Sequence, residues 1–352
     1  MMITLAIDAM GGDHGLDVTV PASVAAVQAH RDIRLMLVGQ ETRIREKLDA
    51  VGAGDAGRIS IQSASEIVAM DDPPALSIRR KKDSSMRVAI NMVKEGIADA
   101  CVSAGNTGAL MATSKFVLGT IDGIDRPAIC GILPRMSGST YMLDLGANVA
   151  VSPEILFQFG IMGSQLIESH GGPGNPTVGL LNIGVEEFKG DETIKAAADL
   201  FKNSDLNYVG YVEADDIYMG NIDLIVCDGV LGNIALKASE GVAQFIMSVI
   251  RQEFTRSVFN KVAALASRST LNAVKNRLDH RHYNGASLIG LNGVVVKSHG
   301  GTDSVGFRCA IEFASKAAGS GLVERIGRQI SERMRSEAVS DRGSGARIPG
   351  LS

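Results

Sequence analysis

The sequence is poor in cysteine and contains no long hydrophobic run. Its four cysteines lie far apart in apolar patterns and form no CxxC pair, which argues for reduced, buried thiols in a cytoplasmic protein and against a zinc site. No apolar run reaches the roughly 18 residues that a membrane span requires. The N-terminal residues lack the charged start and cleavage site of a signal peptide. We therefore expect a soluble, cytoplasmic protein, for which contact with a membrane surface stays open. The cysteines are Cys101, Cys130, Cys227 and Cys309.

Basic residues are not in excess either. The chain has 35 Lys and Arg against 39 Asp and Glu, a net charge of −4, which argues against a general role with nucleic acid. Attraction to an acidic partner must then come from local basic patches. With 352 residues, 45% of them hydrophobic, the chain is long enough for a large core, as one large α/β domain or as two lobes that share a sheet.

Short apolar strand patterns alternate with helical patterns. Residues 3–8, 34–38, 59–62 and 100–102 predict strands, while residues 18–30 and 43–51 predict helices. This alternation is typical of an α/β/α sandwich with a mainly parallel, Rossmann-like sheet. Further strands are expected at 178–182, 209–213, 224–226 and 294–297, and a hairpin at 128–133 and 140–144. We expect one domain over residues 1–335 and a disordered tail, rich in Ser, Gly and Arg, over 336–352.

Residues 100–107 predict a strand, a turn and the start of a helix, and the rest of the α/β pattern is organised around this segment. A buried strand at 100–102 leads into Ser103, Gly105 and Asn106, whose turn lets a ligand approach the backbone, and Thr107 is the expected N-cap. Free N–H groups at such a helix start attract a phosphate or a carbonyl oxygen. The alternative is an ordinary β–α turn, but similar turns elsewhere in the chain favour the anion site.

Polar residues also follow several other predicted strands. In an open α/β sheet, ligands gather at the carboxyl ends of strands, where polar side chains are not needed for the core. The first of these turns is glycine-rich and carries acids and a histidine, although a tight turn with a solvated histidine is an alternative reading. The candidate residues at these ends are Asp8, Gly11, Gly12, Asp13, His14, Asp144, Asn148, His299 and Asp303.

Two more strand ends carry a lysine and an asparagine. Lys189 lies in a charged turn after the strand at 178–182, and Asn233 follows the strand at 224–226, where we expect it to open a helix. Simpler readings exist for both. Lys189 fits a surface lysine paired with Glu186 or Asp191, and Asn233 fits a helix N-cap.

Two segments are rich in basic residues. Residues 236–266 have the apolar spacing of a long amphipathic helix, and residues 251–281 hold seven basic residues against two acidic ones. A helical segment over about 236–280 suits a subunit interface or a membrane surface, or else packs on its own domain. His280 and His282 have no third ligand nearby, so we expect an exposed loop and no metal.

The other basic segment, residues 79–87, is a solvated face or a docking patch for an acidic partner. It contains Arg79, Arg80, Lys81, Lys82 and Arg87.

Four of these turns form an ordered set. They are DAMGGDHG from Asp8, SAGNTGA from Ser103, LLNIGVEEFKG from Leu180 and DGVLGNIALK from Asp228, accompanied by RRKKDSSM and KSHG. Together they resemble the bacterial phosphate acyltransferases of the PlsX family, over nearly all of the chain to about Arg335. The resemblance implies a fold like that of phosphotransacetylases and isopropylmalate dehydrogenases, with a long protruding helical pair.

The resemblance also implies an activity and partners. The family transfers a long-chain fatty acyl group from acyl carrier protein to inorganic phosphate, which gives acyl phosphate for phospholipid (phosphatidic acid) synthesis. It implies a homodimer, peripheral association with the membrane, and no cofactor. It leaves open a contact with the membrane-bound glycerol-3-phosphate acyltransferase of the same pathway. Carrier protein is acidic, so the cluster from Arg79 to Arg87 and the basic helical segment are the expected docking surfaces.

In this reaction phosphate is itself the nucleophile. No serine or cysteine attack is needed, which agrees with the absence of a GxSxG elbow. Orientation and charge stabilisation remain for the protein to supply. We expect Lys189 to be the cation that holds phosphate or neutralises the transition state, and Asn233 to donate to phosphate or to the carbonyl oxygen. Both match the motif positions where the family's catalytic role is placed. Ser103, Asn106 and Thr107 are the expected anion cradle, and the other strand-end residues are weaker candidates.

Three other functions stay open on the sequence. A short-chain phosphotransacetylase that uses acyl-CoA shares the phosphate chemistry but needs no patch for carrier protein. An NAD-dependent decarboxylating dehydrogenase of the same broad fold needs a coenzyme site and carboxylates around a divalent metal, and the sequence does not assemble either convincingly. The third is a non-enzymatic scaffold at a membrane surface, built around the basic helical segment.

Overall fold

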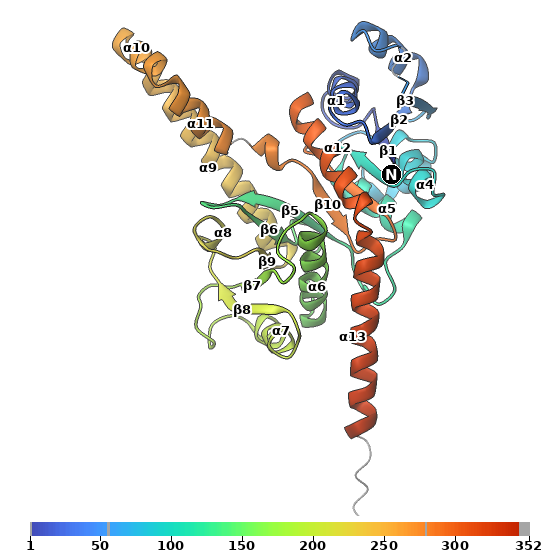
Figure 1. The fold of residues 1–352 in the computed structure, drawn as a ribbon. Coiled ribbons are helices and arrows are strands. Elements are labelled where there is room, and N and C mark those ends of the chain that lie inside the picture. The colour runs from blue at the N-terminus through green and yellow to red at the C-terminus, as the bar shows by residue number, and fades with distance from the viewer. Residues whose placement is uncertain (1, 55–56, 279, 345–352) are drawn as a thin grey trace, which may run out of the picture.

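The computed structural model describes residues 2–54, 57–278 and 280–344. In this part of the chain eleven strands form a single mixed sheet with the order β3-β2-β1-β4-β11-β10-β5-β6-β9-β7-β8 (Figure 1). The strands are β1 (Ile3–Asp8), β2 (Ile33–Gly39), β3 (Ile59–Ser63), β4 (Ala100–Ser103), β5 (Ala128–Pro134), β6 (Ser139–Leu143), β7 (Thr177–Leu181), β8 (Asn207–Val212), β9 (Leu224–Val226), β10 (Ala286–Ile289) and β11 (Val294–Lys297).

Helices cover both faces of this sheet. The core on one face involves α1, α2, α6, α7, α12 and α13, and the core on the other face involves α4, α5, α8 and the start of α9. The expected α/β/α sandwich is therefore confirmed. The helices are α1 (Leu16–Ala29), α2 (Glu41–Ala50), α3 (Pro74–Arg80), α4 (Ser85–Lys94), α5 (Thr107–Leu118), α6 (Pro153–Ser169), α7 (Glu192–Lys202), α8 (Asp216–Met219), α9 (Gly229–Thr255), α10 (Val258–Ala266), α11 (Arg268–Leu278), the 3-10 helix η1 (His280–Tyr283), α12 (Ser304–Gly319) and α13 (Leu322–Ser344).

The two halves of the sheet run in opposite directions. Strands β3, β2, β1, β4 and β11 are mutually parallel, as are β6, β9, β7 and β8, and antiparallel pairings through β10 and β5 connect the two sets. One row of paired residues crosses the centre, from Val102 through Val296, Ser287 and Cys130 to Leu143. Strands of both halves end just beyond this row. The turns that follow them consequently flank the same central pair, β10 and β5.

Several local predictions were wrong. The helix expected over 236–266 is broken after Thr255, because Ser257 accepts a hydrogen bond from the Asn260 N–H (3.1 Å) and caps a new helix, α10, that packs back against α9. The strand β10 was not expected, because four residues between glycines carry little pattern. The disordered tail expected from Ser336 is helical as far as Ser344 in α13, a segment rich in helix-forming Glu and Arg. Residues 345–352 lie outside the described residues.

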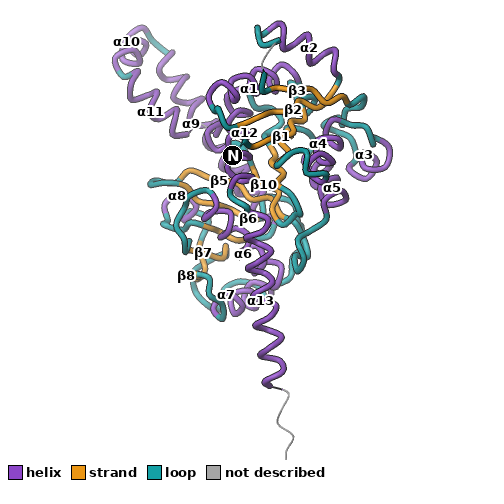
Figure 2. Tube along the Cα trace, turned by 45° about the vertical axis from the view of Figure 1, so that its right-hand side comes forward, coloured by secondary structure: helices purple, strands orange, loops and turns teal. Residues whose placement is uncertain are grey.

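Helix α9, with α10 and α11, forms an arm that stands away from the sheet, and α13 leaves the body in another direction (Figures 1 and 2). The expected protruding pair of helices is thus present. Cys101, Cys130 and Cys227 are buried free thiols, as expected, whereas Cys309 is partly exposed.

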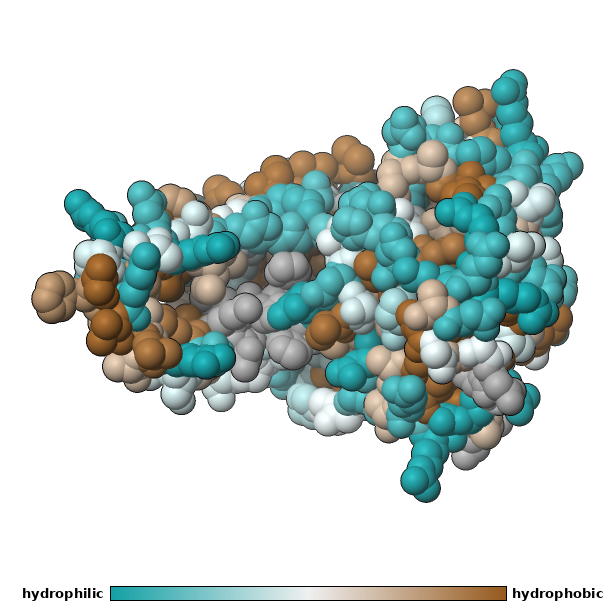
Figure 3. All heavy atoms as spheres, turned by 90° about the horizontal axis from the view of Figure 1, so that it is seen from above, coloured by the Kyte–Doolittle hydropathy of each residue, from teal (hydrophilic) through white to brown (hydrophobic). Residues whose placement is uncertain are grey.

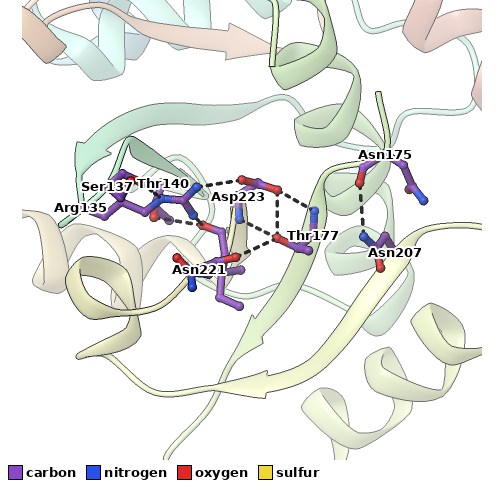
Figure 4. Close-up of polar contacts among 9 residues, drawn as sticks. Arg135, Ser137, Thr140, Asn175, Thr177, Asn207, Asn221 and Asp223 are labelled. Carbon is purple, nitrogen blue, oxygen red and sulfur yellow. Dashed lines mark hydrogen bonds and ion pairs between the residues drawn. The ribbon is translucent and has the colours of Figure 1, made fainter. Parts of the chain in front are cut away.

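A polar network anchors the start of β9 between its neighbours. The Asp223 carboxylate accepts hydrogen bonds from the Arg135 guanidinium (3.1 Å) and from the backbone and hydroxyl of Thr177 (both 3.0 Å). Figure 4 shows Asp223 between these two side chains. Arg135 also donates to the Ile222 carbonyl (2.8 Å). The network therefore ties the β5–β6 hairpin to β9 and β7.

We expect Asp223→Ala to lower the free energy of unfolding by about 2 to 3 kcal/mol, because it leaves the largely buried Arg135 without its carboxylate. Denaturant unfolding measures this difference. The matched control is Asp205→Ala, at an exposed position outside the network, for which we expect a change within about 0.5 kcal/mol. Equal effects of the two substitutions would show that the network contributes nothing.

Candidate active site

A cavity of about 560 Å³ lies on the central strands, between α9 and the turns that follow β1, β4 and β11. Its apolar side includes Ile129, Gly131 and Leu133 of β5 and Leu145. Its polar groups come from both halves of the sheet. They are Asp13, Thr107, Tyr218, Asn233, Lys237, Ser239, Glu240, Tyr283, Asn284, Lys297 and His299. The cavity thus combines an apolar wall with a concentration of polar and charged groups.

Asn233 lies in the second turn of α9 rather than at its start. The helix begins at Gly229, and the Asp228 carboxylate caps it by accepting from the N–H groups of Val230 (2.7 Å) and Leu231 (2.9 Å). The expectation that Asn233 opens the helix was wrong, because an acidic residue occupies the capping position. The amide of Asn233 is therefore not needed as a cap, and the residue lines the cavity.

A close backbone contact holds this part of α9 in place. A Cβ atom on Gly232 would lie 1.9 Å from the Asp144 carbonyl oxygen, so only glycine lets the helix approach the turn after β6 so closely. The Asp144 carboxylate accepts from the N–H groups of Ile129 (2.9 Å) and Asn148 (2.7 Å) and from the Asn148 side chain (2.9 Å). Burial raises its pKa, and these hydrogen bonds oppose that effect. Asp144 and Asn148 thus build the turn that positions Asn233, and neither lines the cavity.

Asp8 performs the equivalent task in the other half of the sheet. Its buried carboxylate accepts from the hydroxyls of Ser85 and Ser103, both at 2.6 Å. Burial raises the pKa of Asp8, and the hydrogen bonds from the two serines oppose this shift. Ser103 also accepts from the Gly105 N–H (3.0 Å) and is fully buried. Ser103, Gly105 and Asp8 are therefore not among the residues that line the cavity.

The start of α5 differs in detail from the prediction. Asn106, not Thr107, is the N-cap, because its side-chain oxygen accepts from the Ala109 N–H (2.9 Å). Its amide nitrogen donates to the carbonyls of Met70 (2.6 Å) and Asp72 (3.2 Å), so it also holds the loop before α3. Thr107 becomes the first helical residue and lines the cavity.

The glycine turn after β1 meets the turn after β11. The Asp13 N–H donates to the Gly300 carbonyl (3.0 Å), and both residues line the cavity with His299. Gly12 has φ 89°, and a Cβ there would meet Ala104 and Gly300, so this crossing requires glycine, while Gly11 packs on Asp8 in the same way. His14 faces a different hollow, which Arg43 and Lys47 also line. Asp303 caps α12 and pairs with Arg281 (2.7 Å) outside the cavity.

Lys189 lies on the loop after β7 and forms an ion pair with Glu186 (2.7 Å). This pairing is the simpler arrangement considered for it. The hydrogen bond from Lys189 lowers the pKa of Glu186, whose side chain is exposed. Within the described structure Lys189 does not line the 560 Å³ cavity.

Two lysines of the cavity were not chosen from the sequence. Lys297 is the last residue of β11, in the KSHG motif, and only 8% of it is exposed. Lys237 lies one turn beyond Asn233 on α9 and pairs with Glu240 (2.7 Å). The available signal was a lysine that directly follows three valines, since a buried strand seldom ends in a buried charge without a purpose.

The basic cluster surrounds the C-terminal end of α3. Arg79, Arg80 and Lys82 are exposed. Lys81 instead pairs with Asp72 and donates to the Ile67 carbonyl (2.7 Å), and the Arg87 guanidinium lies over the Phe116 ring (5.0 Å to its centre). Three of the five predicted docking residues are therefore open to a partner. In the described residues no three His, Cys, Asp or Glu side chains gather as a metal site.

Comparison with known proteins adds independent information. A family model described as "Fatty acid synthesis protein" matches residues 3–325. A phosphate acyltransferase of Paraburkholderia phytofirmans is 53% identical over 332 residues, which cover 94% of this chain and 90% of that protein. Another from Halorhodospira halophila is 53% identical over 329 residues, which cover 93% and 96%.

Solved structures share the fold. A phosphotransacetylase from Streptococcus pyogenes superposes with a TM-score of 0.61 at 16% identity, covering 90% of this chain and 94% of the other. A 4-hydroxythreonine-4-phosphate dehydrogenase from Klebsiella pneumoniae gives 0.53 at 13% identity, with 90% and 99% covered. These low identities support the fold alone. The family match and the 53% identical relatives show more: this chain belongs to the phosphate acyltransferases of the PlsX family and is an acyltransferase that acts on phosphate.

Proposed function

We propose that the enzyme transfers a long-chain fatty acyl group from acyl carrier protein to inorganic phosphate, and that the acyl phosphate serves phospholipid synthesis. The observation that carries the proposal is the composition of the cavity in a chain of this family. An apolar wall on β5 is suited to an acyl chain, and Asn233, Thr107 and Lys297 supply donors next to it. The dehydrogenase alternative has the weaker case, since only the fold supports it.

The chemistry requires no covalent enzyme intermediate. A phosphate oxygen attacks the thioester carbon, the new C–O bond forms, and the C–S bond breaks. Hydrogen phosphate gives its proton to the departing sulfur, so the products are the acyl phosphate and the free carrier thiol. Charge develops on the carbonyl oxygen during attack, and a fixed donor there lowers the barrier.

Within this scheme Asn233 donates to the carbonyl oxygen or to phosphate. Lys189 is the proposed cation for the transition state, which requires its ammonium to exchange Glu186 for the substrate. Such an exchange is feasible, because an exposed ion pair of this kind contributes only about 0.2 to 1 kcal/mol. Thr107 and Asp13, which line the cavity, remain proposed contacts for phosphate or for the thioester.

The exposed residues Arg79, Arg80 and Lys82 form the proposed docking surface for acidic carrier protein. They lie at the end of α3, whose Pro74 contacts the start of α5 at Gly108. The adjoining loop residue Met70 and the helix residue Thr107 line the cavity. A carrier docked on α3 would therefore have its thioester arm close to the cavity mouth.

The arm formed by α9, α10 and α11 is the proposed membrane contact. Large apolar side chains cover its free end, with Phe259 89% exposed and Val258, Val262 and Leu265 also exposed. Figure 3 shows this hydrophobic end of the arm in brown on the left. Arg256 and Lys261 lie among them, which favours anionic lipid. In the described residues no helix is long and apolar enough to cross a bilayer. The same surface also suits the proposed homodimer.

The substrate is tested by mixing the purified protein with phosphate and either palmitoyl carrier protein or palmitoyl-CoA. We expect mass spectrometry to detect the mixed anhydride, with the carrier protein as the better donor. The double variant Arg79→Glu and Arg80→Glu should raise the KM for the carrier protein about tenfold and leave the KM for palmitoyl-CoA unchanged. A wild-type preference for a short-chain acyl-CoA would instead establish the phosphotransacetylase alternative.

The catalytic residues are tested by phosphate-dependent release of carrier thiol. We expect Asn233→Ala to lower kcat by about 10² to 10³, because it removes one donor to the developing charge, and Lys189→Ala to lower it at least about tenfold. Asn203→Ala, an exposed helix cap, is the control for asparagine. Lys195→Ala is the control for Lys189, since both lysines pair with a glutamate three residues earlier and their side chains are 36% and 34% exposed. Unchanged release in Lys189→Ala would remove Lys189 from the mechanism.

Membrane contact is tested by flotation of the protein with vesicles of phosphatidylglycerol and phosphatidylcholine. We expect the wild type to float and the double variant Val258→Asp and Phe259→Asp to stay in solution, because the variant loses apolar contact and gains negative charge. Sedimentation velocity on both proteins gives their oligomeric state. If the variant floats like the wild type but becomes monomeric, the apolar end is a subunit interface.

A further inference from the structure

The Lys297 ammonium is a buried charge with unusual partners. It donates to the backbone carbonyl oxygens of Ala104 (3.2 Å) and Ser298. An ammonium has three N–H donors. The third has no acceptor among the residues that the structure describes, and Lys297 lines the cavity. Two carbonyls thus hold the group in place while one donor stays available to a ligand.

No ion pair in the described part of the chain includes Lys297. Burial lowers the pKa of Lys297 to about 8, and attraction from the Asp13 and Asp8 carboxylates opposes the shift. Neither acid is in contact with it, and Asp8 is already satisfied by Ser85 and Ser103. Lys237 approaches from α9 and its repulsion lowers the pKa further. An uncompensated buried cation is costly, so a bound anion would stabilise this site.

We propose that inorganic phosphate binds in the 560 Å³ cavity against the ammonium of Lys297, on the side of the turns after β4 and β11, and so opposite Asn233 on α9. The inference rests on the proposed function and deepens it, because it assigns the phosphate subsite to a residue other than Lys189. A dianion there accepts the third N–H of Lys297 and lies between two lysines that otherwise repel each other.

The placement also suits the reaction. Gly300 and Gly301, in the turn after β11, line the same cavity, with the Asp13 carboxylate packed near both. The first residue of α5, Thr107, adds a hydroxyl. The apolar residues of β5 form another wall of the cavity, along which an acyl chain would bring its thioester carbon towards the phosphate. Lys297 therefore holds the nucleophile, and a cation or donor on the opposite side remains free to act on the carbonyl.

The proposal is tested with Lys297→Met in the full-length protein, since methionine keeps most of the side-chain length and removes the charge. We expect the KM for inorganic phosphate to rise at least tenfold and the KM for acyl carrier protein to change less than twofold. Titration with phosphate alone, followed by calorimetry, should show the same loss of binding without any turnover. Lys94→Met, at an exposed position on α4, is the control and should leave both constants unchanged.

A pH series separates phosphate binding from a structural role. In the wild type the phosphate KM should rise as pH passes about 8, roughly tenfold for each further unit, because only the charged lysine holds the anion. Lys297→Arg keeps a permanent charge, so its phosphate KM should stay flat over the same range. The other titratable groups around the site, retained in that variant, are Asp8, Asp13, Lys237, Glu240, Tyr283 and His299.

The outcomes distinguish the two proposals. If the wild type produces no acyl phosphate from any carrier thioester, the proposed function fails. If it turns over normally and Lys297→Met keeps the wild-type phosphate KM and phosphate binding, the assignment of Lys297 is overturned and the function stands. A variant that only melts at a lower temperature, with both KM values unchanged, also overturns it.

Discussion

The site depends on the register of the central antiparallel strands. Because β10 and β5 pair with both halves of the sheet, one row of residues runs from Val102 to Leu143, and strands that run in opposite directions end next to it. A shift of one residue in either pairing would turn every side chain of the shifted strand to the opposite face of the sheet and move the turns apart. The cavity exists because these ends meet.

Two buried carboxylates hold the turns at the ends of these strands in fixed positions. Asp8 ends β1 and accepts hydrogen bonds from the hydroxyls of Ser85 and Ser103. Asp144 follows β6 and accepts from the N–H groups of Ile129 and Asn148. Burial favours their neutral forms, and the surrounding donors favour the charged forms. Neither lines the cavity, so their part is to hold the turns rigid. That rigidity matters for a reaction in which orientation supplies much of the rate.

The lysines around the site differ in whether each is already paired with a carboxylate. Lys189 is partly exposed and paired with Glu186, Lys237 is paired with Glu240, and Lys297 is buried against carbonyl oxygens. A buried and pre-positioned charge attracts an anion without first giving up a partner, whereas a paired surface lysine must exchange one. This difference suggests a division of labour, with one lysine that holds phosphate and another that responds to charge as it develops.

The sequence by itself determined ten of the eleven strands in the described residues, the α/β/α class and the family, because buried strands, glycine turns and ordered motifs are local patterns that can be read along the chain. It also pointed to Asn233, Thr107, Asp13 and His299, which line the cavity. Only the tertiary structure decided that Ser103 does not line the cavity, that Asn106 caps a helix and that Lys297 lines the cavity. These outcomes depend on pairing between strands nearly two hundred residues apart, such as Ser103 with Lys297, and no local pattern records which side chain such pairing leaves buried.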